Sequence, residues 1–431
     1  MTGDMRWDMR CDMTRQGWRR IAVLVALACA SVAAMPARAD ETWSGVLARS
    51  PRWLAAQQAH QAALARAHAV EVNPNDWTPQ ASWAQRSVRT EPGQLATSDT
   101  REWSIGVSRG VRSPGKVAAA EDWARRQREW ADAERAQAWL TLCREALDEA
   151  GALSLARQQA SLWRAHADNL TAQHQALRRR HELGDAARQD VILADAARAQ
   201  AASQATLAEQ RATALQVRWG GRYPGLAVPS VDGVDVVGDA DEAMEALLSR
   251  HPTWQAAEAR ALALKAQARH AQADRQPDPV LGVQYGRERS GAERVVGFNV
   301  TWPLGGPARS ALADAQVAEA ESAQAELQDL RRTLRADLLR WQAEARQSGL
   351  AAQGSALALA QTEQAEQALR RGQALGQVSV GEVLQLQRQL IEQGQLAAQA
   401  RVDAWSASLR WSLESGRVWG VPADAPPAGS D

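Results

Sequence analysis

The sequence has few of the residues that stabilise compact or cross-linked domains. Its 431 residues include one phenylalanine, two tyrosines and three cysteines. Cys11 and Cys29 fall in a segment that we expect to be removed, so Cys143 would stand alone and no internal disulfide is predicted. Basic and acidic residues both number 50, and this balance gives no indication of a nucleic-acid partner.

Common catalytic signatures are also missing. The sequence has no glycine-rich phosphate loop, no HExxH or CxxC motif and no nucleophile elbow. Its seven histidines are scattered, and His166 and His174 lie about 80° apart around one expected helix with no evident third ligand. We therefore expect a protein that is not an enzyme, with no catalytic residues, no cofactor and no metal site.

The N-terminus has the pattern of a secretory signal. Basic residues precede an apolar run of about 14 residues that is too short to span a bilayer. A small-x-small motif ends at Ala39, so the mature chain is expected to begin at Asp40, and the residues before Cys29 form a poor lipidation motif. No other window approaches 18 uninterrupted apolar residues, so any membrane insertion is expected to use strands.

The chain repeats itself with a period of about 200 residues. Pro51 and Trp53 in one copy match Pro252 and Trp254 in the other. Farther on, each copy carries Leu-Gly and then an acid followed by Val, namely Leu183-Gly184 with Asp190-Val191 and Leu375-Gly376 with Glu382-Val383. The second copy is about nine residues shorter over this span, and the simplest explanation is a shorter loop.

Both copies predict a short helix, two strands, a very long helix and a returning helix. Large apolar residues recur every three or four positions, as at Leu327, Leu330, Leu334, Leu338 and Trp341. Each long helix of nearly 70 residues would extend about 100 Å. A generic coiled coil fits these stripes equally well. The expected helices are residues 52–72, 116–183, 187–219, 253–274, 307–375 and 380–413.

Three segments between these helices alternate between large apolar and small or polar residues, and a fourth, around residues 80–88, alternates less cleanly. This pattern is typical of membrane strands, although a soluble hairpin with one buried face fits it equally well. Trp83 and Tyr285 would suit an interfacial girdle, and Gly106 and Asn299 would face a lumen. The residues expected to face lipid are Trp103, Ile105, Val107, Phe298, Val300 and Trp302.

The stretch Val300-Thr301-Trp302-Pro303-Leu304-Gly305-Gly306 resembles the strand-to-helix junction of the TolC-like outer-membrane factor family. The first copy has a degraded junction, and its Ser-Pro-Gly-Lys at residues 113–116 slightly resembles the heavy-metal, CzcC-like branch. The resemblance covers about residues 40–420 and rests on the repeat, the strands, the long helices and the signal together.

The resemblance implies a homotrimeric outer-membrane channel. Each subunit would give its strands to one barrel in outer-membrane lipid, and its helices to a tunnel through the periplasm. The channel would serve a tripartite efflux pump or a type I secretion system, exporting small molecules or metal cations. Its partners would be a periplasmic adaptor and, indirectly, an inner-membrane pump of the RND or ABC type.

The resemblance also places adaptor contacts at the turns between the long and returning helices. Each turn glycine follows the last periodic residue of a helix, where a left-handed cap is needed. The expected docking residues are Leu183, Gly184, Val191, Leu375, Gly376, Ser379 and Val383. Threefold symmetry would gather Asp185, Asp190 and Glu382 into acidic rings at an aperture. Alternatively, these residues only cap helices, and Ser379 with Glu382 has the pattern of a capping box.

The expected organisation is a signal peptide at 1–39, a first repeat at 40–219, a linker at 220–239, a second repeat at 240–420 and a disordered tail at 421–431. Two other classes of protein remain open. A periplasmic adaptor would carry one helical hairpin flanked by other strand domains, and a coiled-coil scaffold would carry no membrane strands.

Overall fold

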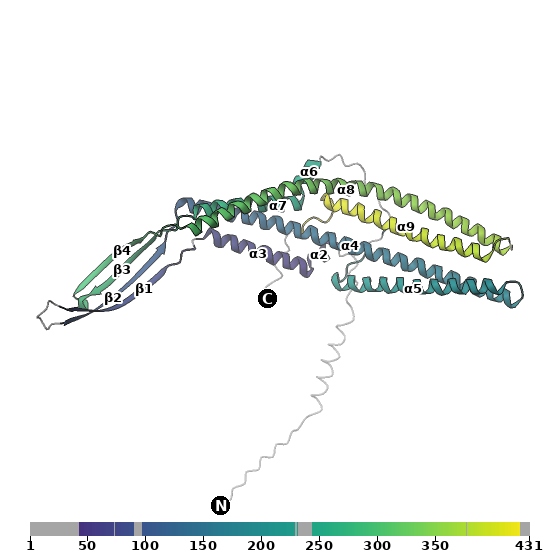
Figure 1. Ribbon diagram of the computed structural model, residues 1–431, viewed down its shortest axis with the longest axis horizontal. Helices are drawn as coiled ribbons and strands as arrows, with labels where there is room; N and C mark the ends of the chain where they lie inside the picture. The colour runs from purple at the N-terminus through teal and green to yellow at the C-terminus, as the bar shows by residue number, and fades with distance from the viewer. Residues whose placement is uncertain are drawn as a thin grey trace, which may run out of the picture. The chain divides into compact units, whose positions relative to one another are not determined.

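The computed structural model describes residues 43–72, 74–89, 97–228, 231, 244–375 and 377–422 (Figure 1). The chain divides into two units, Met1–Trp43 and Ser44–Asp431, and nearly all described residues belong to the second. The expected signal peptide with its cleavage site before Asp40, most of the linker, the turn residue Gly376 and the tail from residue 423 lie outside the described residues.

The second unit consists of two copies of one arrangement. The first copy contains α3 (Pro51–Glu71), β1 (Thr78–Arg89), β2 (Thr97–Gly110), α4 (Pro114–Glu182) and α5 (Arg188–Arg222). The second contains α7 (Pro252–Ala273), β3 (Val280–Glu288), β4 (Glu293–Thr301), α8 (Pro307–Ala374) and α9 (Val380–Glu414). This order confirms the expected fold of long helical hairpins in two repeats, each with a β-hairpin.

Three short elements were not expected from the sequence. They are α2 (Trp43–Ala48), α6 (Met244–Arg250) and the 3₁₀ turn η1 (Arg289–Gly291). With six, seven and three residues they are too short for a helical period to appear in the sequence.

The Pro-x-Trp motif shared by the two copies is a helix start. Ser50 Oγ accepts a hydrogen bond from the backbone N–H of Trp53, and Pro51 occupies the first turn of α3. In the second copy His251 takes the place of serine, and its Nδ1 accepts from the backbone N–H of Thr253. Both caps satisfy a backbone donor that the first turn leaves without a partner.

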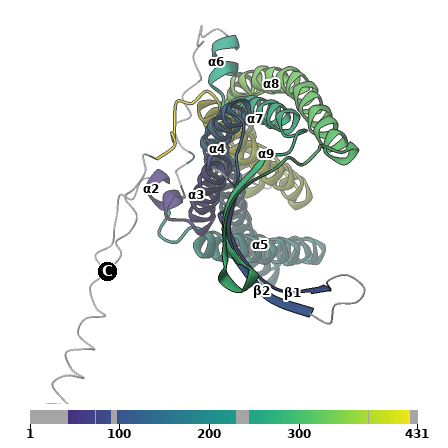
Figure 2. The same ribbon diagram turned by 90° about the vertical axis from the view of Figure 1, so that its left-hand side faces the viewer.

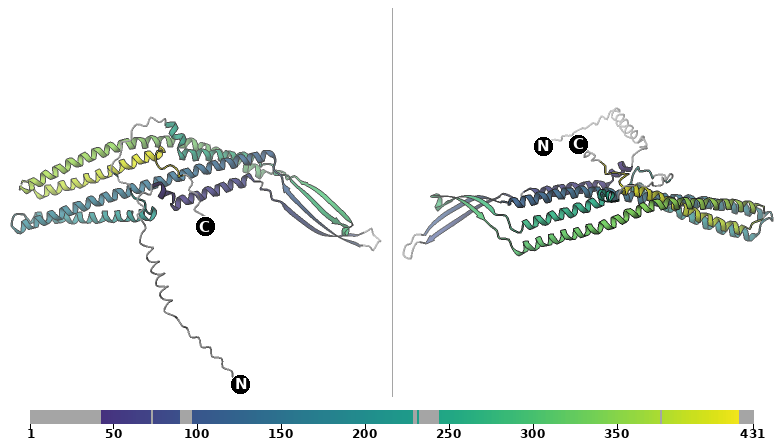
Figure 3. Two further views of the ribbon diagram at one scale, coloured as in Figure 1. Left: turned by 180° about the vertical axis from the view of Figure 1, so that it is seen from behind. Right: turned by 90° about the horizontal axis from the view of Figure 1, so that it is seen from above.

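Helix α4 is central to the helical part of the molecule. It packs against α3, α5, α7 and α9, while α8 packs against α7 and α9 (Figure 2). The leucine stripe of α8 is divided between two apolar clusters. Leu334 and Leu338 contact Trp411 of α9, and Leu327 packs with Ala261 of α7. The two hairpins α4–α5 and α8–α9 run side by side to their turns (Figure 3). Among the described residues, no helix has the length and apolarity needed to cross a membrane.

The four strands form one antiparallel sheet in the order β1-β2-β3-β4. Strands β1 and β4 are its edges, and no other described strand pairs with them. The first hairpin has strands of 12 and 14 residues, whereas both strands of the second have nine. The shorter second copy therefore reflects shorter strands as well as a shorter turn, which corrects the expectation of a loop deletion alone.

Candidate membrane sheet and hairpin tips

One face of the sheet is apolar and exposed, and we refer to it as the apolar face. Because side chains alternate along each strand, the pairing register brings residues of all four strands onto it. Phe298, for example, pairs with Val283 and is 69% exposed. The described members include Trp83, Trp103, Ile105, Val107, Leu281, Val283, Tyr285, Val296, Phe298 and Val300. The six residues expected to face lipid thus lie together, with Trp302 directly after β4.

The opposite face carries small and polar residues, and we refer to it as the polar face. Its members include Gln80, Ser82, Ser104, Gly106, Ser108, Gly282, Gln284 and Asn299. Ser82 and Ser104 are hydrogen-bonded across the strands at 2.8 Å. Asn299 lies over Gly282, where a Cβ atom would come within 2.5 Å of the Asn299 Oδ1. The glycine is needed here because the asparagine side chain occupies that space.

An ion cluster around the buried side chain of Lys116 joins the two copies where the sheet meets the helices. Lys116, in the first turn of α4, donates from Nζ to Asp274 at 2.9 Å and to Asp278 at 2.7 Å. Asn75 donates to the other oxygen of Asp278 at 3.0 Å. Burial raises the pKa of Asp278, but the hydrogen bonds from Lys116 and Asn75 outweigh it and hold the pKa below its usual value. The cluster fixes the first copy's long helix to the second copy's strand entry.

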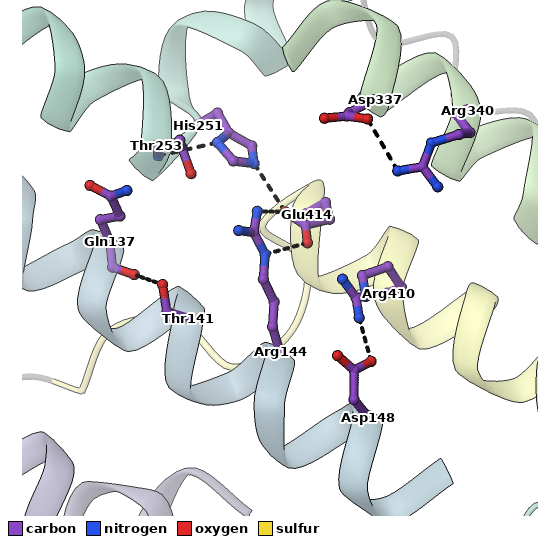
Figure 4. Close-up of polar contacts among 10 residues, drawn as sticks. All are labelled: Gln137, Thr141, Arg144, Asp148, His251, Thr253, Asp337, Arg340, Arg410 and Glu414. Atoms are coloured by element: carbon purple, nitrogen blue, oxygen red, sulfur yellow. Dashed lines mark hydrogen bonds and ion pairs between the residues drawn. The ribbon is translucent and has the colours of Figure 1, made fainter. Parts of the chain in front are cut away.

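A second buried cluster joins α4, α7 and α9 (Figure 4). The Glu414 carboxylate accepts from Arg144 Nε at 2.7 Å and Nη2 at 2.6 Å, and from His251 Nε2 at 3.1 Å. His251 Nδ1 accepts from the Thr253 N–H, so Nε2 carries the proton that reaches Glu414. Burial raises the pKa of Glu414, but the hydrogen bonds from His251 and Arg144 have the larger effect and hold the pKa below its usual value.

The turn ends of the two hairpins are held together by an apolar cluster. Leu170 and Leu177 of α4 pack with Ala194 of α5, and with Val380 and Leu384 at the start of α9. The turn leucines remain outside this cluster, since Leu183 is 78% and Leu375 74% exposed. The tips therefore present exposed leucines beside a packed apolar cluster.

The structure places the expected tip residues in different environments. Ser379 is exposed, Val191 is half-buried against the apolar cluster, and Val383 is only 1% exposed. The Val383 side chain would therefore contribute to docking by stabilising the start of α9 and not by contacting an adaptor directly. Asp185 and Glu382 are exposed and Asp190 is half-buried in the first turn of α5.

The turn chemistry of both copies agrees with the sequence pattern. Gly184 has a φ of 86°, a left-handed conformation that residues with a Cβ rarely adopt. The backbone N–H of Gly184 donates to the His181 carbonyl, and the backbone N–H of Asp185 donates to the Arg180 carbonyl. This pair of hydrogen bonds is a Schellman motif. In the second copy the Gln377 N–H donates to Gly372 across the same span, while Gly376 itself is outside the described residues.

The two returning helices start differently. Ser379 Oγ accepts from the Glu382 N–H at 3.3 Å, and Glu382 accepts from the Ser379 N–H at 2.9 Å, so the predicted capping box is present. The backbone hydrogen bond from Ser379 also holds the pKa of Glu382 below its usual value. In the first copy Ala187 occupies the cap position and provides no side-chain hydrogen bond.

The two histidines considered as ligands have other surroundings. His166 lies edge-on to Trp163, and burial lowers its pKa. His174 lies 3.8 Å from Asp195. Within the described part of the chain, no three histidine, cysteine or acidic side chains are grouped so that they could hold a metal ion.

No family model and no curated protein matches the chain by sequence. Its fold, in contrast, is that of solved bacterial outer-membrane channels. The CmeC outer-membrane channel of Campylobacter jejuni is similar with a TM-score of 0.72, 11% identity and coverage of 88% of this chain and 85% of that one. The outer-membrane channel OprN has a TM-score of 0.70, 18% identity and coverage of 87% and 89%. VceC, an outer-membrane protein of Vibrio cholerae, has a TM-score of 0.66, 19% identity and coverage of 86% and 94%.

Proposed function

We propose that the chain is a subunit of an outer-membrane channel that serves a tripartite efflux pump or a type I secretion system. Three copies would join their sheets edge to edge in one barrel, and their helices would extend it as a tunnel through the periplasm. The observation that carries this proposal is the sheet itself. One of its faces is apolar and exposed, and its edges, β1 and β4, pair with no further strand in the described part of the chain.

Such a sheet is unfavourable in isolation. The edge strands leave backbone N–H and C=O groups without partners, and in lipid each unpaired group costs several kcal/mol. Pairing β4 of one copy with β1 of the next removes both edges and places the apolar face against lipid. The polar face would then line a water-filled lumen, which suits its serine, glutamine and asparagine side chains.

The helices suit a long tunnel. Helix α4 has 69 residues, or about 100 Å of length. We propose that the tunnel carries small molecules or metal cations delivered by an inner-membrane pump. The Ser113–Lys116 junction gives no reason to prefer metal, because Ser113 caps α4 and Lys116 binds Asp274 and Asp278.

The periplasmic adaptor would dock at the hairpin tips, where Leu183 and Leu375 are exposed. A Gly184→Pro substitution should abolish efflux while the oligomer still reaches the outer membrane, since proline cannot adopt the positive φ of this turn. A cysteine replacing exposed Gln377 should form a crosslink to the adaptor in cells. Wild-type efflux in the proline variant, together with no crosslink at Gln377, would place docking elsewhere.

The adaptor alternative predicts one helical hairpin, whereas the described residues contain two, α4–α5 and α8–α9. Membrane fractionation distinguishes the proposals. The channel should be extracted from the outer membrane as an oligomer, and its deletion should make cells sensitive to the pump's substrates. An adaptor would fractionate with the inner membrane, and a scaffold would remain in the periplasm.

A further inference from the structure

The apolar face ends in a group of three arginines near the β3–β4 turn. Arg287 of β3 and Arg294 of β4 are directly paired, and Trp103 of β2 pairs with Arg287. Arg101 lies two residues beyond Trp103, and its backbone N–H donates to Ser290 in the turn. By the alternation of side chains, all three arginines share the apolar face.

Three acidic residues at this level lie on the face of the sheet opposite these arginines. Glu102, Glu288 and Glu293 alternate onto the polar face. Glu102 accepts from Arg86 at 3.3 Å on that same face, and Glu293 accepts from Arg289 in the turn at 2.8 Å.

The described part of the apolar face carries one acid at this level, Asp99, and its carboxylate is already engaged. It accepts hydrogen bonds from Ser87 Oγ at 2.6 Å and from Gln85 Nε2 at 3.4 Å. Among the described residues, none of Arg101, Arg287 and Arg294 has an ion-pair partner, and Arg287 Nε has no acceptor. Like charges placed directly opposite each other destabilise an antiparallel pair, so an anion from outside the subunit would stabilise the pairing of Arg287 with Arg294.

The position of the arginines indicates where that anion lies. From Trp302 to Arg294 the apolar face extends about 27 Å along the chain, close to the length that a tilted strand needs to cross the hydrocarbon core. Trp83, Trp103 and Tyr285 lie beside the arginines, and Trp103 contacts Tyr285 edge-on at 6.0 Å. Aromatic rings of this kind lie at headgroup level. The β3–β4 turn lies at the end of the sheet away from the helices, as Figure 1 shows, and would face the cell exterior.

An arginine at the other end of the apolar face behaves differently. Arg109 donates from Nε to the Asn75 carbonyl at 2.9 Å and lies 5.0 Å over the Trp77 ring. The Arg109 guanidinium therefore has both a hydrogen-bond acceptor and an aromatic partner within the subunit. The three arginines at the turn end differ in this respect from the arginine at the other end of the apolar face.

We propose that Arg101, Arg287 and Arg294 bind the phosphate groups of a phosphorylated glycolipid in the outer leaflet. The inference rests on the proposed function, which places the apolar face in the outer membrane. Guanidinium groups match phosphate oxygens by paired, charge-assisted hydrogen bonds. The acyl chains of the same lipid would lie along Ile105, Val296 and their neighbours, so one molecule satisfies the charged and the apolar parts of the site.

The test uses the full chain, extracted as an oligomer in neutral detergent. Native mass spectrometry would count retained molecules of bis-phosphorylated lipid A and of its dephosphorylated form. The wild type should retain the phosphorylated lipid at least about tenfold more tightly, because only that form meets the guanidinium groups. This comparison needs no substitution. Equal retention of the two forms, or displacement of the lipid by inorganic phosphate, would overturn the proposal.

Substitutions then assign the effect to the arginines. The triple variant Arg101→Gln, Arg287→Gln, Arg294→Gln should lose the preference for phosphorylated lipid. Arg86→Gln, on the polar face, should keep it and serves as the matched control. A triple variant with undiminished preference would also refute the site. If the wild type is not recovered from the outer membrane, the proposed function fails instead.

Discussion

A substitution at the centre of the apolar face gives a quantitative test of the sheet's orientation. Val283 of β3 pairs with Phe298, which lies four residues from Trp302 and four from Arg294 along β4. The Val283–Phe298 pair therefore lies at the middle of the apolar face. Val283 is 54% exposed, so Val283→Arg would place a guanidinium directly in hydrocarbon.

The expected free-energy cost of the substitution depends on how deep the residue lies in the bilayer. An arginine at the lipid midplane of a barrel costs roughly 2–4 kcal/mol, and this falls to about 0–1 kcal/mol near the interface. Three subunits would together lose roughly 6–12 kcal/mol if the sites act independently. Val300→Arg, about 7 Å closer along the strand to Trp302, should cost less. Gln284→Arg is the matched control, because Gln284 is adjacent in sequence but lies on the polar face.

The assay is the amount of oligomer in the outer-membrane fraction, followed by its thermal unfolding in detergent. The yield should fall most for Val283→Arg, less for Val300→Arg and least for Gln284→Arg. Equal yields for Val283→Arg and Gln284→Arg would refute the assignment of the apolar face to lipid.

The remaining predictions concern the helical part. Glu414→Gln should destabilise the fold by roughly 1.5–3 kcal/mol, because the half-buried Arg144 loses its charged hydrogen-bond acceptor, and thermal unfolding would measure it. Since the folded pKa of Glu414 lies below its usual 4.5, the stabilisation should be complete above that pH and be lost as the pH falls through the lower folded value, a dependence absent in the Gln variant. Ser379→Ala should cost about 1 kcal/mol and increase proteolysis at the second tip, whereas Ala187→Ser should protect the first; unchanged cleavage in both would contradict the role of the caps.

The sequence predicted most of the fold because its signals are local. Helices of 69 and 68 residues repeat their apolar stripe many times, so α4 and α8 were located within two residues of their observed ends. The strand pattern was readable in three of the four segments, whereas in β1 the alternation is weaker because its outer half carries mostly polar residues.

The buried polar clusters were not predicted, and the reason is distance along the chain. Lys116 is 158 residues from Asp274 and 162 from Asp278, and nothing near Lys116 in the sequence indicates those partners. Likewise, no role was predicted from the sequence for His251, which directly precedes the repeated Pro-x-Trp motif, although it both caps α7 and binds Glu414, 163 residues away. The three arginines of the apolar face became a group only when the register was known.

The central claim, that several copies close one barrel in the outer membrane, can be tested by disulfide formation between the edge strands. Within a subunit β1 and β4 are three strand spacings apart, roughly 14 Å, whereas a disulfide needs Cα atoms within about 7 Å. A cysteine at Ala81 of β1 can therefore bond to one in β4 only in a neighbouring subunit.

The measurement uses chains with Cys143→Ala, Ala81→Cys and, in turn, Val296→Cys, Phe298→Cys or Val300→Cys, because all these edge positions lie on the apolar face. Our account predicts that oxidation of intact cells gives a covalent trimer in the outer-membrane fraction for at least one pairing, and that chains with only one introduced cysteine give none. Monomers alone for every pairing, or recovery of the chain from the soluble periplasm, would contradict it.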